Sequence, residues 1–191
     1  MDGTIIDKLY EDNTSVLTRL LEANEISMYS DLDGKLKKVL VMSAASYFET
    51  EIRSIIEIFV SRVSNANAAV IGLVKNKAIE RQFHTYFSWK DRNANLFFSI
   101  FGEAFSKHCR EQVKGDKEIT DAIAAFMELG ETRNKLAHLN FGVFPIDKTS
   151  AEIYGLYRRA VPFVTYIQKK LVDERGIPPG SPPASNDRVT S

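Results

Sequence analysis

LKKVLVMSAASYFETEIRSIIEIF, residues 36–59, decides the fold class. Its apolar side chains recur every three or four residues, the period that places them on one face of an α-helix. The members of this stripe are Leu36, Val39, Leu40, Met42, Ala45, Phe48, Ile52, Ile55, Ile56 and Phe59. Ser30 and Asp31 are suitable caps for the first turn, so we expect one long helix that ends near residue 62.

The same period predicts four further helices, over about 4–24, 68–82, 103–113 and 117–139, and a last helix that includes Ile153 to Leu171. The segment 81–105 holds one Trp, one Tyr and six Phe without a single clean period, which favours short helices and turns. Residues 173–191 are rich in Pro, Gly and Ser and cannot offset the entropy of ordering, so they are predicted to be a disordered tail. We therefore predict one all-α domain over 1–172, a bundle of four to five main helices whose last two long helices are antiparallel.

Composition excludes several classes of protein. The chain has 191 residues, 44% of them hydrophobic, which is enough for a core without disulfides or metals. Its 25 basic and 25 acidic residues leave no net charge to hold nucleic acid, so phosphate binding requires a local patch. A single cysteine, an acidic first segment unlike a signal peptide, and the lack of an uncharged apolar run of roughly 18 residues predict a cytoplasmic protein without a membrane span.

ETRNKLAHLNFG, residues 131–142, places several polar side chains at the end of a predicted helix. At about 100° per residue, Arg133 and His138 project roughly 140° apart, so they can flank a groove, with Asn134 on the side of His138. A histidine in a last helical turn is favoured in its protonated form, which suits a proton donor. A phosphate held there needs Arg133, with help from Lys135. The alternative is a helix end that is capped by cations and has no further role.

RNKLAH, preceded by AFMELGET and followed by LNFG, resembles the Arg-x4-His motif of HEPN domains, in the variant with a polar residue after the arginine. YFETEIRSII resembles the HEPN helix that carries an acidic residue facing this motif, with Glu49 as the better match and Glu51 as the second. TYFSWKDRNANLFFSIFGEAF is similar to the central insert of the RiboL-PSP and MAE-type subgroups of prokaryotic defence and toxin systems. The resemblance covers about 35–170.

The resemblance implies a metal-independent endoribonuclease without a cofactor, in which the ribose 2′-hydroxyl attacks phosphorus and leaves a 2′,3′-cyclic phosphate. His138 would act as general acid or base, Arg133 would stabilise the phosphate, Asn134 would orient a substrate oxygen, and Glu49 would fix the arginine or histidine. It also implies a homodimer with a composite cleft, acting on RNA as a toxin or defence effector under control of an antitoxin or trigger protein. The alternatives are a non-catalytic HEPN dimer that binds RNA, nucleotide or protein, and a plain helical interaction domain.

Other residues have two interpretations each. Trp89 suits base stacking with single-stranded RNA, with Arg81, Lys90 and Arg92 as cations for the phosphates. The favoured interpretation of the aromatic segment as a whole is packing, either onto the bundle or at a dimer interface.

Arg158 suits either a basic patch near the cleft or simple solvation. His84 is interpreted as a partly buried packing residue and His108 as a surface residue, and Cys109 as a small buried side chain; His108 and Cys109 lack the further ligands that a metal site needs.

Overall fold

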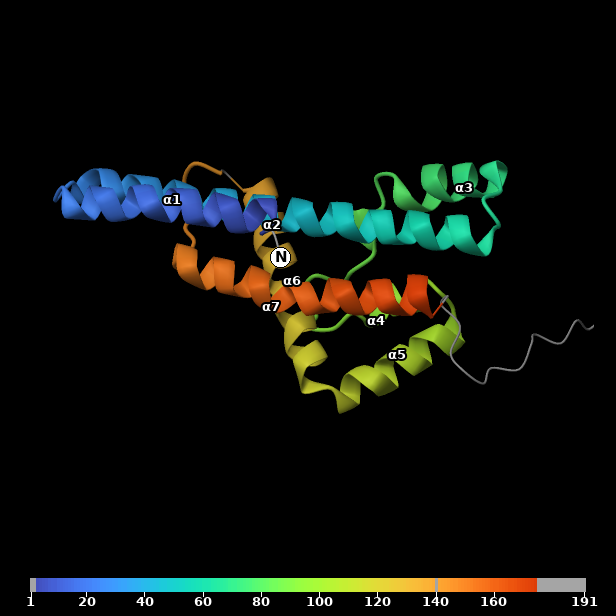
Figure 1. The fold of residues 1–191 in the computed structure, drawn as a ribbon. Coiled ribbons are helices and arrows are strands. Elements are labelled where there is room, and N and C mark those ends of the chain that lie inside the picture. The colour runs from blue at the N-terminus through green and yellow to red at the C-terminus, as the bar shows by residue number, and fades with distance from the viewer. Residues whose placement is uncertain (1–2, 140, 175–191) are drawn as a thin grey trace, which may run out of the picture.

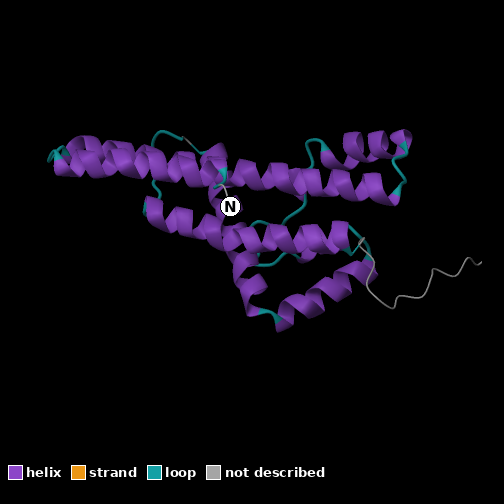
Figure 2. Cartoon of the chain, in the orientation of Figure 1, coloured by secondary structure: helices purple, strands orange, loops and turns teal. Residues whose placement is uncertain are grey.

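The computed structural model describes residues 3–139 and 141–174, and these residues form seven α-helices and no strand (Figures 1 and 2). The helices are α1 Ile5–Glu22, α2 Ile26–Val63, α3 Ala68–Val74, α4 Asn95–Ser99, α5 Glu103–Gly115, α6 Lys117–His138 and α7 Ser150–Gln168. Three short turns complete them: π-helical η1 Lys75–Ile79, 3₁₀-helical η2 Phe83–Thr85 and π-helical η3 Lys169–Asp173. The all-α prediction is confirmed. Of the predicted tail, 173–191, the first residue, Asp173, still belongs to η3. Residues 175–191 lie outside the described residues.

Helix α2 is the longest element, with 38 residues, and it begins earlier than the sequence suggested. Ser30 and Asp31, expected to cap it, lie inside the helix. Asp31 accepts a hydrogen bond from Lys35 one turn later at 2.6 Å, which satisfies the carboxylate without a capping role. The connection from α1 is short because Asn24 adopts a left-handed conformation, with φ of 58°, that turns the chain back at once.

The third predicted helix, 68–82, is shorter than expected. Asn67 caps α3 through its side chain, which accepts hydrogen bonds from the backbone N–H groups of Ala69 and Val70. The helix widens into η1 after Val74 and ends at Ile79. Arg81, with φ of 60°, then turns the chain out of the helical path.

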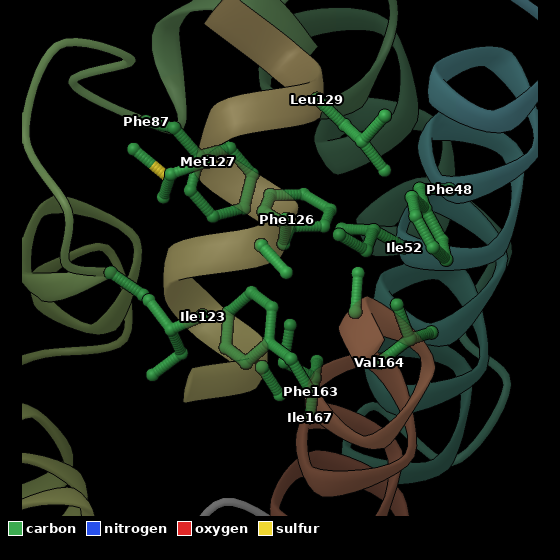
Figure 3. Close-up of a cluster of buried hydrophobic side chains, with 14 of the residues drawn as sticks. Phe48, Ile52, Phe87, Ile123, Phe126, Met127, Leu129, Phe163, Val164 and Ile167 are labelled. Carbon is green, nitrogen blue, oxygen red and sulfur yellow. The ribbon is translucent and has the colours of Figure 1, made fainter. Parts of the chain in front are cut away.

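An aromatic core holds the three long helices and the insert together (Figure 3). Phe126 of α6 lies between Phe48 of α2, at a centroid distance of 5.5 Å, and Phe163 of α7, at 5.1 Å. Phe87 from the insert packs against Phe126 at 4.9 Å. Phe87, Phe97 and Phe98 are each no more than 3% exposed, so the packing interpretation of the aromatic segment is confirmed for these side chains.

Helices α6 and α7 pack directly on each other in opposite chain directions. Ile119, near the start of α6, lines a groove with Thr165, near the end of α7. Glu128, in the middle of α6, forms an ion pair with Lys148, just before α7, at 2.8 Å. The predicted antiparallel arrangement is therefore correct. In the part of the chain that the structure describes, no helix has an apolar stretch long enough to cross a membrane.

Candidate active site

Three segments meet around a pocket of about 430 Å³. One wall is the C-terminal half of α6, the second is the middle of α2, and the third is segment 81–89, between η1 and α4. The volume of the pocket lies in the range of about 300 to 1,000 Å³ that is typical of small-molecule and cofactor sites. A ligand of nucleotide size is compatible with such a pocket.

The α6 wall is one face of the helix, with lining residues three or four positions apart until the helix ends. They are Phe126, Leu129, Gly130, Arg133, Asn134 and His138. The apolar members lie deeper in the core, and the polar members follow toward the C-terminus. The wall therefore changes from apolar to polar along the helix, as suits a ligand with an apolar and a charged part.

The polar end of this wall carries the sequence motif. Arg133 is half-buried, and its Nη1 donates a hydrogen bond to Oδ1 of Asn134 at 3.2 Å. His138 is the last residue of α6, and it is exposed where it lines the pocket. Arg133 and His138 line the same pocket within one chain, despite the roughly 140° between their positions on the helix, because the arginine side chain is long.

The α2 wall contributes a carboxylate. Ala45, Phe48 and Glu49 line the pocket from one face of the helix. Glu49 is half-buried, and its Oε1 lies 3.8 Å from Nη1 of Arg53, one turn further along. Glu51, the second candidate, is not among the lining residues. It is near Tyr47, where burial, followed by the charge of Glu51, raises the pKa of the phenol.

Trp89 is one of the residues of the third wall, and it connects this wall to α6. The indole stacks on Phe126 at a centroid distance of 5.9 Å and donates a hydrogen bond from Nε1 to the carbonyl oxygen of His84 at 3.2 Å. A Cβ atom at Gly130 would lie 1.9 Å from Cζ3 of Trp89, which no packing tolerates. Gly130 is therefore required for the indole to lie against the helix, one turn before Arg133.

Segment 81–89 also brings Arg81, one of the cations near Trp89 that suit RNA phosphates, and His84, which was not placed in the site from sequence. Arg81 and His84 both line the pocket, and both are exposed. His84 was expected to be a partly buried packing residue, and that prediction is wrong: its neighbours Phe83 and Tyr86 pack inward while the imidazole stays outside. Gly130 was also missed, although a lone glycine inside a long helix, costing about 1 kcal/mol relative to alanine, was a usable signal.

Lys135 and Arg158, two candidates for substrate binding, lie away from the pocket. Lys135 follows Asn134 by one position, about 100° around the helix, and pairs with Glu131 at 2.7 Å. Arg158 donates a hydrogen bond to the carboxylate of Asp7 at 3.1 Å.

The carboxylate of Asp7 is the centre of a network that fixes the start of α1 on α7. Burial opposes its ionisation, but hydrogen bonds from Tyr154, Thr4 and Arg158 outweigh that effect and lower the pKa of Asp7 below its ordinary value. Arg158 therefore has an internal partner that explains its position.

His108 and Cys109 lie on α5, and neither lines the pocket. Cys109 is fully buried, as expected, and burial is the main cause that raises the pKa of its thiol. His108 was expected at the surface, but it is half-buried and its Nε2 is enclosed, because this side of α5 faces the rest of the bundle.

The bundle presents an Arg-x4-His motif, on its penultimate long helix, to a pocket that a glutamate of the longest helix also lines, and this arrangement resembles that of HEPN domains. The chain belongs to the RiboL-PSP-HEPN family, whose model matches residues 7–173. The match includes α1, which the sequence resemblance did not cover. Neither the curated proteins nor the solved structures gave a match.

Proposed function

We propose that this protein is a metal-independent endoribonuclease of a toxin or defence system. It cleaves RNA by attack of the ribose 2′-hydroxyl on the adjacent phosphorus, which leaves a 2′,3′-cyclic phosphate and a 5′-hydroxyl. The observation that carries this proposal is the convergence of Arg133, Asn134, His138 and Glu49 on one pocket. Membership of the family supports it, since HEPN domains are often RNases.

The motif on α6 supplies the groups that this chemistry needs. His138 is exposed where it lines the pocket and transfers a proton to or from the reacting oxygens, a function that contributes about 10² to 10⁴-fold to a rate. Arg133 is a permanent cation where negative charge builds up on the phosphate. Asn134, already hydrogen-bonded to Arg133 at 3.2 Å, orients the guanidinium and a phosphate or ribose oxygen.

Glu49 positions the cations from the opposite wall. Its carboxylate keeps one long contact, 3.8 Å, with Arg53 and faces the pocket that Arg133 lines. A carboxylate in such a place attracts a guanidinium and fixes its orientation without lying on the phosphate itself. Glu49 is therefore a positioning residue in this proposal.

Trp89 provides the surface for a base. The indole forms a wall of the pocket, and its position is fixed by Phe126 and by the hydrogen bond to His84. Bases that stack on aromatic side chains must first leave a helix, so the substrate is single-stranded or has an unpaired nucleotide at the cleavage site. The neutral net charge of the chain agrees with recognition through this local site.

The active form is a cytoplasmic homodimer that an antitoxin or a trigger protein controls. Leu139, Phe141 and Val143, directly after the motif, are 54%, 46% and 76% exposed. Apolar side chains gathered beside an active site favour a protein partner that covers them. HEPN domains often dimerise, which agrees with a second copy in this place.

Cleavage of mixed RNA in the presence of EDTA tests the function. Wild-type protein should produce 2′,3′-cyclic phosphate ends, and His138→Ala should not. Cleavage that requires added divalent metal would exclude this mechanism. Binding of RNA without any cleavage would assign the protein to the non-catalytic HEPN modules.

A further inference from the structure

The chain as a whole is neutral, but one segment beside the pocket is strongly basic. Segment 75–92, from η1 to the loop before α4, has five basic and two acidic residues, an excess of three positive charges. The rest of the chain therefore has an excess of three negative charges. A local concentration of cations attracts a polyanion even on a neutral protein.

Most cations of this segment have no acidic partner within the protein. Lys75 has only a long contact with Glu57, 3.9 Å. The other four are exposed, and none of them forms an ion pair with a carboxylate in the part of the chain that the structure describes. These four are Lys77, Arg81, Lys90 and Arg92, called below the 77–92 cations.

The cations near the end of α6 and the loop after it are, in contrast, already engaged. Lys135 pairs with Glu131 at 2.7 Å. Lys38 donates hydrogen bonds to the carbonyl oxygens of Phe141 and Gly142, at 2.7 and 2.9 Å. The same loop has the exposed apolar side chains that favour a protein partner, so this side of the pocket suits a protein better than an RNA strand.

Segment 75–92 is fixed to the helices around it. It connects α3, which packs on α2, with α4, which packs on α5 (Figure 1). The hydroxyl of Tyr86 donates a hydrogen bond to the carbonyl oxygen of Ala78 at 2.5 Å, and Trp89 lies against Gly130 of α6. Ala94, just after the segment, is 1% exposed. Because these fixed residues adjoin the cations in the chain, less conformational entropy is lost when a ligand binds.

The basic segment is continuous with the pocket. Arg81 lines the pocket together with the aromatic side chains of Phe83 and Trp89. Proteins that hold single-stranded nucleic acid combine cations for the phosphates with aromatic side chains on which bases stack. A strand whose reacting nucleotide occupies the pocket therefore meets further cations if it continues over segment 75–92.

We propose that the 77–92 cations bind the phosphates that flank the cleavage site, so that a single-stranded RNA leaves the pocket over η1 and the loop before α4. This inference rests on the function proposed above, because the pocket must hold the nucleotide that is cleaved. Contacts to phosphates carry no sequence information, so this surface holds the strand while the pocket selects the nucleotide. In the homodimer each copy contributes one such surface.

The salt dependence of binding tests the surface. The variant Lys77→Ala, Lys90→Ala, Arg92→Ala removes three cations and keeps Arg81, which lines the pocket. The probe is a fluorescently labelled single strand of about 16 nucleotides, made fully 2′-deoxy so that it lacks the attacking hydroxyl. Each contact to a single-strand phosphate contributes a slope of about −0.7 in log affinity against log salt, so the triple variant should have a slope less steep by about 2. Its affinity should be about 100-fold weaker at about 0.1 M salt and equal to that of wild type near about 1 M.

A second triple variant is the matched control. Lys107→Ala, Arg110→Ala, Lys114→Ala removes the same number of charges from exposed positions on α5, outside the pocket, and should keep the wild-type slope. Lys77→Arg with Lys90→Arg should also keep it, because the charge is retained. Circular dichroism verifies that each variant is helical.

Cleavage of an RNA of the same length separates this inference from the proposed function. If the triple variant of the basic segment raises KM at low salt and keeps kcat, the surface binds the substrate. If wild type cleaves and this variant keeps the wild-type slope and KM, only this inference is overturned, and the cations serve solvation or a protein partner. An equal loss of slope in the α5 control would also overturn it, since the effect would be one of total charge. If wild type does not cleave RNA, the proposed function is overturned, and the salt slopes alone decide whether the surface binds RNA as part of a non-catalytic module.

Discussion

Two carboxylates of this domain lie beside arginines, and they differ in how completely they are hydrogen-bonded. Asp7 accepts hydrogen bonds from the hydroxyl of Tyr154 at 2.7 Å, from Arg158 at 3.1 Å, and from the N–H and hydroxyl of Thr4 at 2.6 and 2.9 Å. Glu49 has Arg53 at 3.8 Å and faces a pocket.

The difference explains which arginines are available for a ligand. A buried carboxylate with four donors has little capacity left, so the Asp7 network stabilises the fold. The pocket around Glu49 instead has cationic groups from two walls and an open volume of about 430 Å³. An arginine beside a carboxylate can therefore be structural or functional. The two cases are separated by how many internal donors the carboxylate already has and by whether an open pocket adjoins it.

His138→Ala should have the largest effect on the rate of RNA cleavage and very little effect on stability. We expect the rate of RNA cleavage to fall about 10² to 10⁴-fold. Because the side chain is exposed, the free energy of unfolding should change by no more than about 0.5 kcal/mol. Initial rates of cyclic-phosphate formation and urea denaturation measure the two quantities.

Tyr154→Phe is the corresponding substitution in the Asp7 network. In contrast to His138→Ala, it should lower stability and leave the cleavage rate unchanged. It removes one donor to Asp7, so the free energy of unfolding should fall by about 1 kcal/mol while the cleavage rate stays the same. A loss of activity in this variant would show that the two regions are not separate in function.

Gly130→Ala tests how far the pocket depends on the contact with Trp89. The new methyl group must displace the indole, so we expect a loss of about 1–3 kcal/mol in stability and a marked loss of activity. Trp89 is the only tryptophan, and its intrinsic fluorescence should shift to longer wavelength as the ring leaves its site.

Gly34→Ala is the control for this change. Gly34 lies inside α2, and a Cβ atom there would have no neighbour within 4 Å. The substitution should raise stability by about 0.4–1 kcal/mol and leave the fluorescence unchanged. Equal responses of the two glycines would contradict the packing of Trp89 on α6.

Asp7→Asn should make the stability of the domain less dependent on pH. The pKa of Asp7 is lower in the folded protein than its ordinary value of 3.8, so its stabilising contribution is complete above that value. The contribution is lost as the pH falls through the lowered folded-state pKa. We expect the variant to be about 1–2 kcal/mol less stable at neutral pH, since a cap and several hydrogen bonds are weakened.

Urea denaturation from about pH 5 to pH 2 measures this dependence. Wild type should lose more stability than Asp7→Asn over that range. Parallel curves for the two proteins would show that another acidic group, and not Asp7, carries the linkage.

The α6 half of the site could be predicted from sequence, and the physical reason is local. The apolar period of α6 and the cations at its end gave a helix over 117–139, and the structure has Lys117–His138. The motif was identified by its resemblance to HEPN domains, and the length of the arginine side chain brings Arg133 to the pocket that His138 lines, although the two project roughly 140° apart. Glu49 was selected by the same resemblance, with Glu51 as the second candidate, and of the two only Glu49 lines the pocket.

Segment 81–89 could not be predicted because its conformation is set by distant contacts. Trp89 is placed by Gly130, 41 positions later in the chain, and His84 in turn by Trp89. The aromatic composition indicated burial correctly for Phe87 but gave no means to tell which neighbours stay exposed. Short turns without a period carry little local information, and this is where His84 was misinterpreted.

Arg158→Ala should have the smallest effect and decides whether the Asp7 network also contacts RNA. The arginine side chain is 59% exposed, so the loss of its ion pair should cost well under about 1 kcal/mol, and Asp7 keeps Tyr154 and Thr4 as donors. The KM for a short RNA at low salt should stay at the wild-type value, whereas Arg133→Ala should raise it. A similar rise in both variants would mean that the binding surface extends from the pocket to the start of α1, and hydrogen-bond saturation would then be no guide to function in this fold.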